Sequence, residues 1–256
     1  EQVRRQANAG NGDVGVFVHG YNYNFQEALF RVGQLGALTG NRSTLVLFSW
    51  PSEAVLGGYV ADRDAVTFSR DHLSQLLSDV SALELSGRVG VVGHSMGSWL
   101  VMEALREERL KENDAVVERL SVTLAAPDID IDVFRSQLSV VGRLHSPLTL
   151  LVSPDDRALE LSRRIANGRL RVGLLDVHDP ILQEIATSRG VRVVDISTLA
   201  ASDRFNHDRF ISFAADYAQS MRNTPHRSSL IERAGVYIFT GPGSLFSRPG
   251  RIAGRD

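Results

Sequence analysis

Six short runs of apolar residues recur along the chain, and each ends at polar, glycine or proline residues. The runs cover residues 14–18, 44–50, 88–93, 120–126, 148–153 and 191–197. Continuous runs of this length, rich in β-branched residues, are typical of strands that are buried on both faces of a parallel sheet. The pattern therefore predicts a central sheet of about six strands.

Segments with apolar residues at helical spacing lie between these runs. They span residues 26–38, 62–83, 96–105, 158–166 and 207–221. Strands that alternate with helices favour a mostly parallel sheet with right-handed crossovers and helices on both faces. We expect one α/β domain over residues 1–221, in which residues 1–13 form a polar lead-in.

The alternating pattern fails after Met221, where proline, glycine, serine and arginine become frequent. We expect residues 222–256 to be a partly ordered C-terminal extension that packs on the same domain. Within it, the sequence GVYIFT (residues 235–240) is a candidate for a short edge strand.

Composition and charge exclude several classes of protein. The chain has 256 residues, a net charge of -2 and no cysteine, and it contains no apolar run long enough to span a membrane. We therefore expect no nucleic-acid partner, no disulfide, no thiolate metal site and no cysteine nucleophile. The first residue is Glu1 rather than Met, which leaves open an exported protein, periplasmic or secreted, or a cytoplasmic one.

The sequence GHSMG (residues 93–97) joins a predicted strand to a predicted helix. At so sharp a turn the central residue, Ser95, takes a strained backbone conformation and presents its hydroxyl above the sheet edge. Glycines two residues before and after it relieve the crowding, and the N–H of Met96 is placed to stabilise an oxyanion. The pattern predicts that Ser95 is a nucleophile; a chance match in a glycine-rich loop is the alternative.

A serine hydroxyl needs a base to remove its proton. With this type of turn, the acid and then the histidine follow the serine along the chain, each after a later strand. His207 follows the sixth apolar run and begins a predicted helix, so it is the predicted base; an ordinary histidine at a helix start is the alternative. The remaining histidines come too early or lie elsewhere: His19, His72, His94, His145, His178 and His226.

Asp156, just after the fifth apolar run, is the predicted acid, with Asp155 as the first alternative. A second alternative follows the fourth run, where Asp128, Asp130 and Asp132 alternate with apolar residues. That acidic stretch is equally suited to capping a helix. Its spacing resembles the start of a calcium loop, but the glycine and glutamate expected later in such a loop are missing. We expect no metal and no other cofactor.

The loop after the first run, HGYNYNF (residues 19–25), is the predicted source of the second oxyanion donor, the N–H of Tyr21. A tight turn in which Asn22 caps the next helix is compatible with that role. The residues expected to line the substrate site are His19, Asn22, Trp50, Tyr59 and His94. For the two larger aromatic residues, Trp50 and Tyr59, core packing is the alternative.

Taken together, the sequences FVHGYNYNF, FSWPS, YVADR (residues 59–63, Tyr-x-x-Asp-Arg), GHSMGSWLVMEAL, AAPDIDIDVF, DRAL and NHDRF resemble a bacterial α/β-hydrolase family known as domain of unknown function 900. The resemblance extends from about Val14 to Phe213. It implies an α/β-hydrolase fold and serine hydrolase chemistry with esterase-like members, and it places Ser95, Asp156 and His207 at triad positions. Few residues precede the first strand, and the segment 126–148 is short, so we expect the two N-terminal strands and a large cap to be missing.

These features predict a serine hydrolase that cleaves carboxylic esters with short- to medium-chain acyl groups through an acyl-enzyme. The expected partner is a small-molecule ester, and the oligomeric state stays open. An acyltransferase, thioesterase, peptidase or lipase would use the same residues. A non-catalytic binding module on a hydrolase fold is the alternative from another class.

Overall fold

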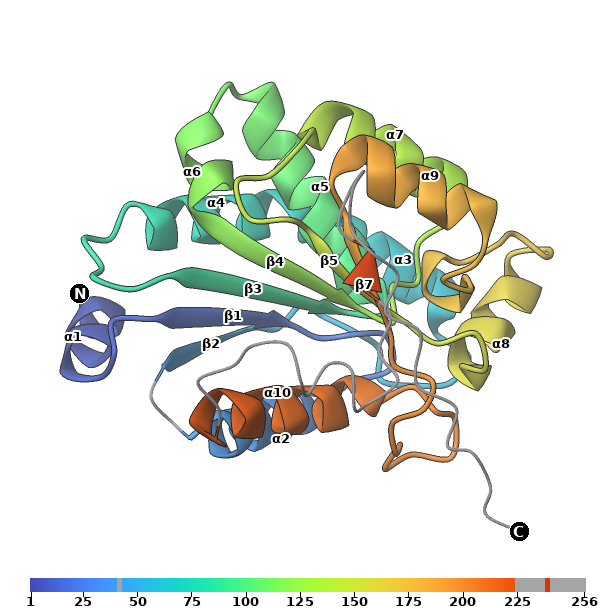
Figure 1. Ribbon diagram of the computed structural model, residues 1–256, viewed down its shortest axis with the longest axis horizontal. Coiled ribbons are helices and arrows are strands. Elements are labelled where there is room, and N and C mark those ends of the chain that lie inside the picture. The colour runs from blue at the N-terminus through green and yellow to red at the C-terminus, as the bar shows by residue number, and fades with distance from the viewer. Residues whose placement is uncertain (41–42, 224–237, 240–256) are drawn as a thin grey trace, which may run out of the picture.

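A single central sheet organises the computed structural model, which describes residues 1–40, 43–223 and 238–239 (Figure 1). The strands are β1 (Val14–Val18), β2 (Thr44–Phe48), β3 (Val89–His94), β4 (Leu120–Ala125), β5 (Thr149–Val152), β6 (Arg192–Asp195) and β7 (Ile238–Phe239). Their order is β2-β1-β3-β4-β5-β6-β7, with the first six parallel and β7 antiparallel at the edge. The predicted six-stranded parallel sheet is confirmed, and so is the edge strand expected within residues 235–240.

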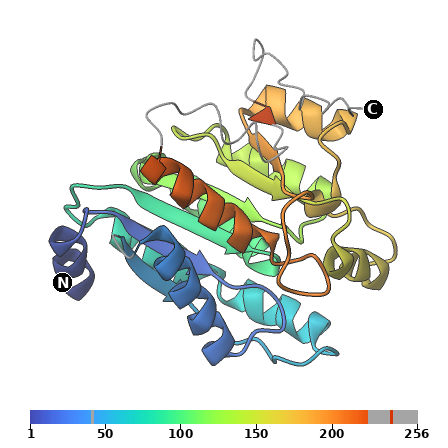
Figure 2. The ribbon, with the colours of Figure 1, turned by 60° about the horizontal axis from the view of Figure 1, so that its bottom comes forward.

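Helices cover both faces of the sheet (Figures 1 and 2). They are α1 (Gln2–Ala9), α2 (Phe25–Thr39), α3 (Tyr59–Phe68), α4 (Arg70–Ser81), α5 (Met96–Leu110), α6 (Asp114–Arg119), α7 (Ile131–Val141), α8 (Arg157–Ile165), α9 (Pro180–Arg189) and α10 (Arg209–Asn223), with a 3₁₀ turn at Val172–Leu174. Helices α2 and α10 lie on one face, where Phe17, Val32 and Phe210 pack in one cluster. The larger cluster on the other face lies beneath α4, α5 and α7. The central strands β1 and β3 are largely buried and apolar, as expected for strands that helices cover on both faces.

Several details differ from the sequence-based expectation. Helices α6, α7 and α9 lie outside the five segments with helical spacing, so the sequence analysis missed them. The polar lead-in contains helix α1, whose Ala7 is buried. The single helix expected over residues 62–83 is divided at Ser69, whose hydroxyl and N–H both donate to the carbonyl of Ala65 (2.9 Å and 3.1 Å). Helix α10 begins at Arg209, so His207 lies in the preceding loop.

The strand order reverses direction at β1. Strands β2 and β3 lie on opposite sides of β1, so the connections after β1 and β3 leave the sheet in different directions. In open α/β sheets, ligands bind outside the carboxyl ends of the strands at such a reversal. The connection from β4 to β5 contains one helix, α7, as expected for a hydrolase fold without a large cap.

The expected C-terminal extension, residues 222–256, lies largely outside the described residues. Only the end of α10 and strand β7 fall within the described part of that range. Among the described helices, none combines the length and the hydropathy that crossing a membrane requires.

Candidate active site

Ser95 forms the sharp turn between β3 and α5. Its φ of 54° and ψ of -120° lie in a region that side-chain-bearing residues rarely occupy. A Cβ at Gly97 would lie 2.4 Å from the carbonyl oxygen of His19, and one at Gly93 would lie 2.8 Å from the Cα of Ser98. The two glycines are therefore required because the start of α5 packs directly against the ends of β1 and β3. This is the strained turn that GHSMG predicts.

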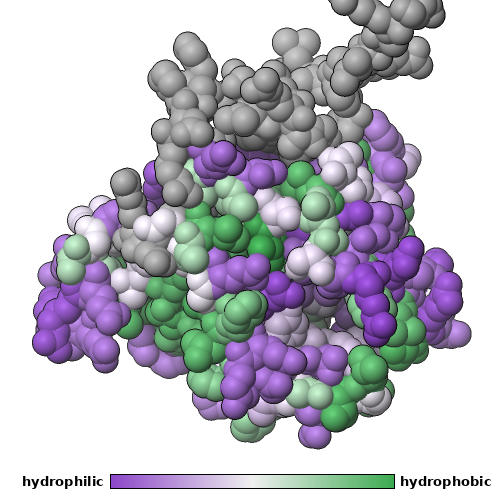
Figure 3. Space-filling model, turned by 90° about the horizontal axis from the view of Figure 1, so that it is seen from below, coloured by the Kyte–Doolittle hydropathy of each residue, from purple (hydrophilic) through white to green (hydrophobic). Residues whose placement is uncertain are grey.

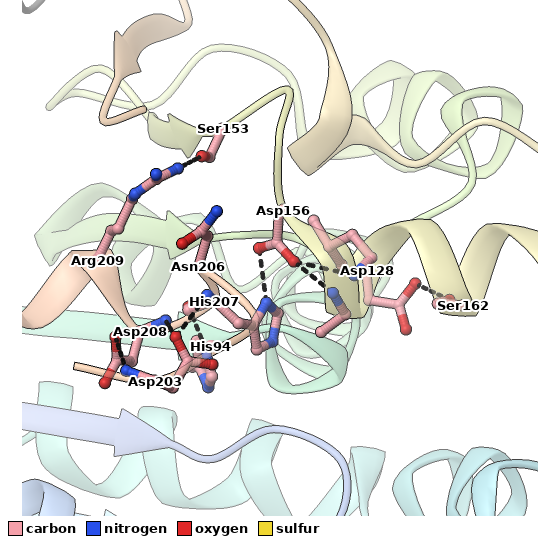
Figure 4. A network of polar contacts seen from close by, with 12 residues as sticks. His94, Asp128, Ser153, Asp156, Ser162, Asp203, Asn206, His207, Asp208 and Arg209 are labelled. Atoms are coloured by element: carbon pink, nitrogen blue, oxygen red, sulfur yellow. Dashed lines mark hydrogen bonds and ion pairs between the residues drawn. The ribbon is translucent and has the colours of Figure 1, made fainter. Parts of the chain in front are cut away.

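An aspartate–histidine pair lies at the same edge of the sheet (Figure 4). The Nδ1 atom of His207 is 2.7 Å from Oδ2 of Asp156, whose side chain is fully buried. The other Asp156 oxygen accepts hydrogen bonds from the N–H groups of Ala158 (2.9 Å) and Leu159 (3.0 Å), because Asp156 is the N-cap of α8. Both carboxylate oxygens are thus held, and Nε2 is the ring nitrogen of His207 that is left for proton transfer.

The loop that carries His207 is anchored by a second aspartate. Arg209 donates to Oδ2 of Asp155 (2.9 Å) and to the hydroxyl of Ser153 (2.5 Å), and Asn206 donates to the same Asp155 oxygen (3.1 Å). The guanidinium of Arg209 lowers the pKa of Asp155 below its usual value. The structure therefore gives the two neighbouring aspartates different partners: Asp156 holds the imidazole, and Asp155 holds the loop.

His94 lies beneath His207. The ring centroids are 4.6 Å apart, and Nε2 of His94 lies 3.3 Å from the carbonyl oxygen of His207. A carbonyl only accepts, so Nε2 of His94 carries a proton. Burial, reinforced by the nearby His207, lowers the pKa of His94 well below its usual value and keeps it neutral. His94 supports the main chain of the His207 loop from below.

Ser95 directly follows His94 in the chain, so the contact between His94 and His207 places Ser95 and His207 at the same end of the sheet. Within the described residues, no hydrogen bond joins the Ser95 hydroxyl to His207. Hydrogen bonds between a catalytic serine and its base often tighten only when a substrate binds, so the lack of this bond does not argue against proton transfer from Ser95 to His207.

Two opposed effects act on the pKa of His207. Burial lowers the pKa, but the charge and hydrogen bond of the Asp156 carboxylate raise it by more, and the net shift is upward from 6.5. The imidazolium is therefore stabilised where it would form during a proton transfer from Ser95.

The loop after β1 passes directly over the serine. A Cβ at Gly20 would lie 2.9 Å from the Cβ of Ser95 and 3.2 Å from the carbonyl oxygen of His94. The main chain of the next residue, Tyr21, is therefore close to Ser95. The Tyr21 hydroxyl donates to the carbonyls of Val55 (3.0 Å) and Leu56 (2.5 Å), which holds this loop against the loop after β2. Met96 is the first residue of α5, where backbone N–H groups lack helical partners.

The residue that caps α2 is Asn24 rather than Asn22. The Asn24 side chain accepts from the N–H of Glu27 (2.9 Å), and Glu27 accepts in return from the N–H of Asn24. Asn22 instead takes a positive φ of 59° and donates its N–H to Asp62 (3.3 Å). The alternative in which Asn22 caps α2 is thus wrong, because the helix begins at Phe25 and its N-cap is Asn24.

Most of the residues expected to line the substrate site are buried. His19 and Trp50 stack with ring centroids 4.8 Å apart, and the indole N–H donates to the His19 carbonyl (2.9 Å). Tyr59 donates to Asp128 (2.9 Å), and burial together with this carboxylate raises the pKa of Tyr59 to about 12. These contacts organise the loops after β1 and β2, as the core-packing alternative expects. Asn22, in contrast, is half-buried.

The acidic stretch after β4 has structural partners. Asp128 pairs with Arg171 (3.1 Å) and accepts from the hydroxyl of Ser162 (2.6 Å) in a buried network. Asp130 accepts from the N–H groups of Asp132 (3.0 Å) and Val133 (3.2 Å), which confirms the helix-capping alternative for Asp130 but not for Asp128. In the part of the chain that the structure describes, no cluster of His, Asp and Glu is suited to a metal.

Asp62, which lies in the Tyr-x-x-Asp-Arg motif, has a positioning role that the sequence analysis did not assign to it. Its buried carboxylate accepts from the hydroxyl of Ser52 (2.6 Å) and the N–H groups of Glu53 (2.7 Å) and Asn22. It thereby joins the loop after β1 to the loop after β2. The available signal was its spacing: Asp62 lies four residues before Val66, on the face of α3 that is buried.

The sheet, the strained serine at its reversal and the carboxylate-bound histidine after the last parallel strand define an α/β hydrolase. The chain belongs to the family described as alpha/beta hydrolase of unknown function (DUF900), whose model matches residues 2–223.

Two solved structures are similar over part of the chain. A putative hydrolase from Agrobacterium vitis S4 is 13% identical over 61% of this chain and 74% of its own, with a TM-score of 0.38. The iron-lacking apo form of ESTFA is 14% identical over 82% of this chain and 74% of its own, with a TM-score of 0.45. No curated protein is significantly similar in sequence.

Proposed function

We propose that this protein is a serine hydrolase that cleaves carboxylic esters, with Ser95 as nucleophile, His207 as base and Asp156 as the acid. The observation that carries the proposal is the 2.7 Å contact between His207 and Asp156 at the sheet edge where Ser95 adopts its strained turn. The pair alone would be an ordinary buried contact. Its position beside that turn, in an α/β hydrolase, supports acyl transfer.

The proposed reaction has two steps. His207 Nε2 accepts the Ser95 proton as the hydroxyl attacks the ester carbonyl, and the N–H groups of Met96 and Tyr21 stabilise the oxyanion. The tetrahedral intermediate expels the alcohol, which takes the proton back from His207. Water, deprotonated by His207, then attacks the acyl-enzyme and releases the acid and free Ser95.

A fluorophosphonate probe and a series of p-nitrophenyl esters test this proposal together. We expect stoichiometric labelling at Ser95 and release of p-nitrophenol that is greatest for short acyl chains, because the β4–β5 connection provides no cap to enclose a long one. Intact-protein mass spectrometry and absorbance measure the two results. A folded protein that neither reacts with the probe nor turns over any ester would instead favour the binding module.

The rate should depend on the protonation of His207. We expect kcat/KM for p-nitrophenyl acetate to rise with pH through an apparent pKa above 6.5. His207 acts as a base only when neutral, and the Asp156 carboxylate keeps His207 protonated to higher pH. The same raised pKa stabilises the fold below about pH 6.5, and that stabilisation is lost as pH rises through the folded-state value. A pH–rate profile whose acidic limb falls below 6.5 would contradict this assignment of the base.

A further inference from the structure

Four buried polar side chains meet beside the candidate active site without taking part in the proposed reaction. They are Tyr59 at the start of α3, Asp128 in the loop after β4, Ser162 on α8 and Arg171, and each is at most 8% exposed. We call them the polar cluster. The hydrophilic residues that Figure 3 shows on the surface reach water, whereas the polar cluster is closed off from it. Any effect of the polar cluster on a substrate must therefore pass through other residues.

The Asp128 carboxylate holds the polar cluster together. Its Oδ2 atom accepts from the Tyr59 hydroxyl (2.9 Å), and its Oδ1 atom accepts from the Ser162 hydroxyl (2.6 Å). The two hydroxyl oxygens are 2.9 Å apart, and Nε of Arg171 lies 3.1 Å from Oδ1. Arg171 balances the charge of Asp128, which would be costly to bury alone. The two hydroxyls connect α3 and α8 to the loop after β4.

Asp128 also holds the nucleophile turn through its main chain. Its N–H donates to the carbonyl of Ser95 (3.2 Å), and the N–H of Ser95 donates to the carbonyl of Ala125 (2.9 Å). Both main-chain polar groups of Ser95 are thus bonded to the end of β4 and the loop that follows it. A strained backbone conformation persists only where its surroundings hold it, so the position of Asp128 bears directly on Ser95.

The other members of the polar cluster reach the acid and the predicted oxyanion loop. Asp156 is the N-cap of α8, so the bond from Ser162 to the carboxylate of the cluster, drawn in Figure 4, fixes the helix that begins at the acid. The ring of Tyr59 packs edge-on against the ring of Tyr21, with centroids 5.4 Å apart. The polar cluster is thus attached to the nucleophile turn, to the acid and to the loop expected to supply an oxyanion donor.

The distance between Ser95 and His207 depends on attachments of this kind. Within the described residues no hydrogen bond joins the Ser95 hydroxyl to His207, so no direct contact of that kind sets their separation. Their separation is set by the elements to which each residue is bonded. Misplacing reacting groups by about 1 Å can cost about 100-fold in rate, so these attachments matter for a proton transfer.

We propose that the hydroxyls of Tyr59 and Ser162 are positioning groups that hold the Ser95 turn at a fixed distance from the start of α8. They act through the Asp128 carboxylate and touch no substrate. Buried ionic networks can often be replaced by apolar residues without loss of stability, so we assign the contribution of this one to geometry. Its effect on rate rests on the proposed ester hydrolysis, whereas its effect on the contact between the acid and the base does not.

Two conservative variants remove one hydroxyl each. Tyr59→Phe keeps the ring against Tyr21, and Ser162→Ala keeps α8 helical. In both variants Asp128 stays paired with Arg171. We expect kcat for p-nitrophenyl acetate to fall about 10- to 100-fold and KM to stay within about twofold, because the contacts to substrate are unchanged. Labelling by the fluorophosphonate probe, followed over time by intact-protein mass spectrometry, should slow by a similar factor.

Ser74→Ala is the matched control. Ser74 is fully buried, and its hydroxyl donates to the buried carboxylate of Glu108 near the far end of α5. The variant therefore loses the same kind of bond, away from the carboxyl end of the sheet. We expect its melting temperature to fall about as much as that of Ser162→Ala, while its kcat stays within about twofold of wild type. Equal losses of kcat in Ser74→Ala and Ser162→Ala would overturn the proposal.

Proton NMR tests the positioning without relying on turnover. The Nδ1 proton of His207 bonds a buried carboxylate and gives a low-field signal, which His207→Gln identifies by removing it. We expect this proton to exchange with water about fivefold faster in Tyr59→Phe and Ser162→Ala, because the acid is held less firmly. Ser74→Ala should exchange at the wild-type rate. Exchange at the wild-type rate in both hydroxyl variants would contradict the positioning.

The two measurements separate this proposal from the proposed function. Faster exchange in the hydroxyl variants of a protein that neither turns over esters nor reacts with the probe would overturn the ester hydrolysis alone. Ester turnover by a wild type whose hydroxyl variants keep both its kcat and its exchange rate would overturn the positioning alone. Far-UV circular dichroism confirms that each variant is folded.

Discussion

Replacing Ser95 by alanine is expected to reduce kcat for p-nitrophenyl acetate by about 10⁴- to 10⁶-fold and to abolish labelling by the fluorophosphonate probe. The proposed reaction passes through a bond to the Ser95 oxygen, and no other group at the turn can replace that oxygen. The residual rate would come from the oxyanion donors and substrate binding alone. Absorbance assays of wild type and variant at equal concentration measure the ratio.

Ser98→Ala provides a stringent control for this experiment. Ser98 is buried in the same turn, and its hydroxyl donates to the carbonyl of Gly93 (2.8 Å), so it supports the turn without facing the reaction. We expect Ser98→Ala to lower the free energy of unfolding by about 1 kcal/mol and to keep activity within about tenfold. A Ser95→Ala variant as active as this control would place the nucleophile elsewhere.

Replacing Asp156 by asparagine is expected to reduce kcat by about 10⁴-fold. Asparagine can still accept from the N–H groups of Ala158 and Leu159, so α8 stays capped. It cannot supply the negative charge that stabilises the His207 imidazolium, and its amide group favours the wrong ring tautomer. The acidic limb of the pH–rate profile should therefore also move to lower pH, toward or below 6.5.

Asp155→Asn is the matched control, because it alters the adjacent carboxylate in the same loop. Its partners are Arg209, Ser153 and Asn206 rather than the imidazole. Half of the Asp155 side chain is exposed, so losing its charge should cost about 1 kcal/mol of unfolding free energy and less than tenfold in kcat. Equal losses of kcat in the two variants, at equal stability, would show that Asp156 does not act on the histidine as proposed.

Local patterns predicted the six parallel strands and the nucleophile turn well, but they missed helices α6, α7 and α9. The six apolar runs became the six parallel strands, and GHSMG formed the strained turn with φ of 54° at Ser95. Both depend on short stretches of sequence: a strand buried on both faces must be apolar throughout, and a strand–helix corner needs glycine where the main chains touch. The division of the helix at Ser69 escaped prediction because the apolar spacing continues through it; the only local signal is a serine whose hydroxyl donates to the carbonyl of Ala65.

The sequence by itself determined the sheet, its parallel direction, the position of Ser95 and the chain order in which an acid and a histidine must follow. Only the tertiary structure decided which of Asp128, Asp155 and Asp156 meets His207, since all three follow strands that end at the same edge. Periodicity and turn chemistry are local properties of the chain. The partner of a carboxylate depends on distances across the fold, where a difference of one residue turned Asp156 toward the imidazole and Asp155 toward Arg209.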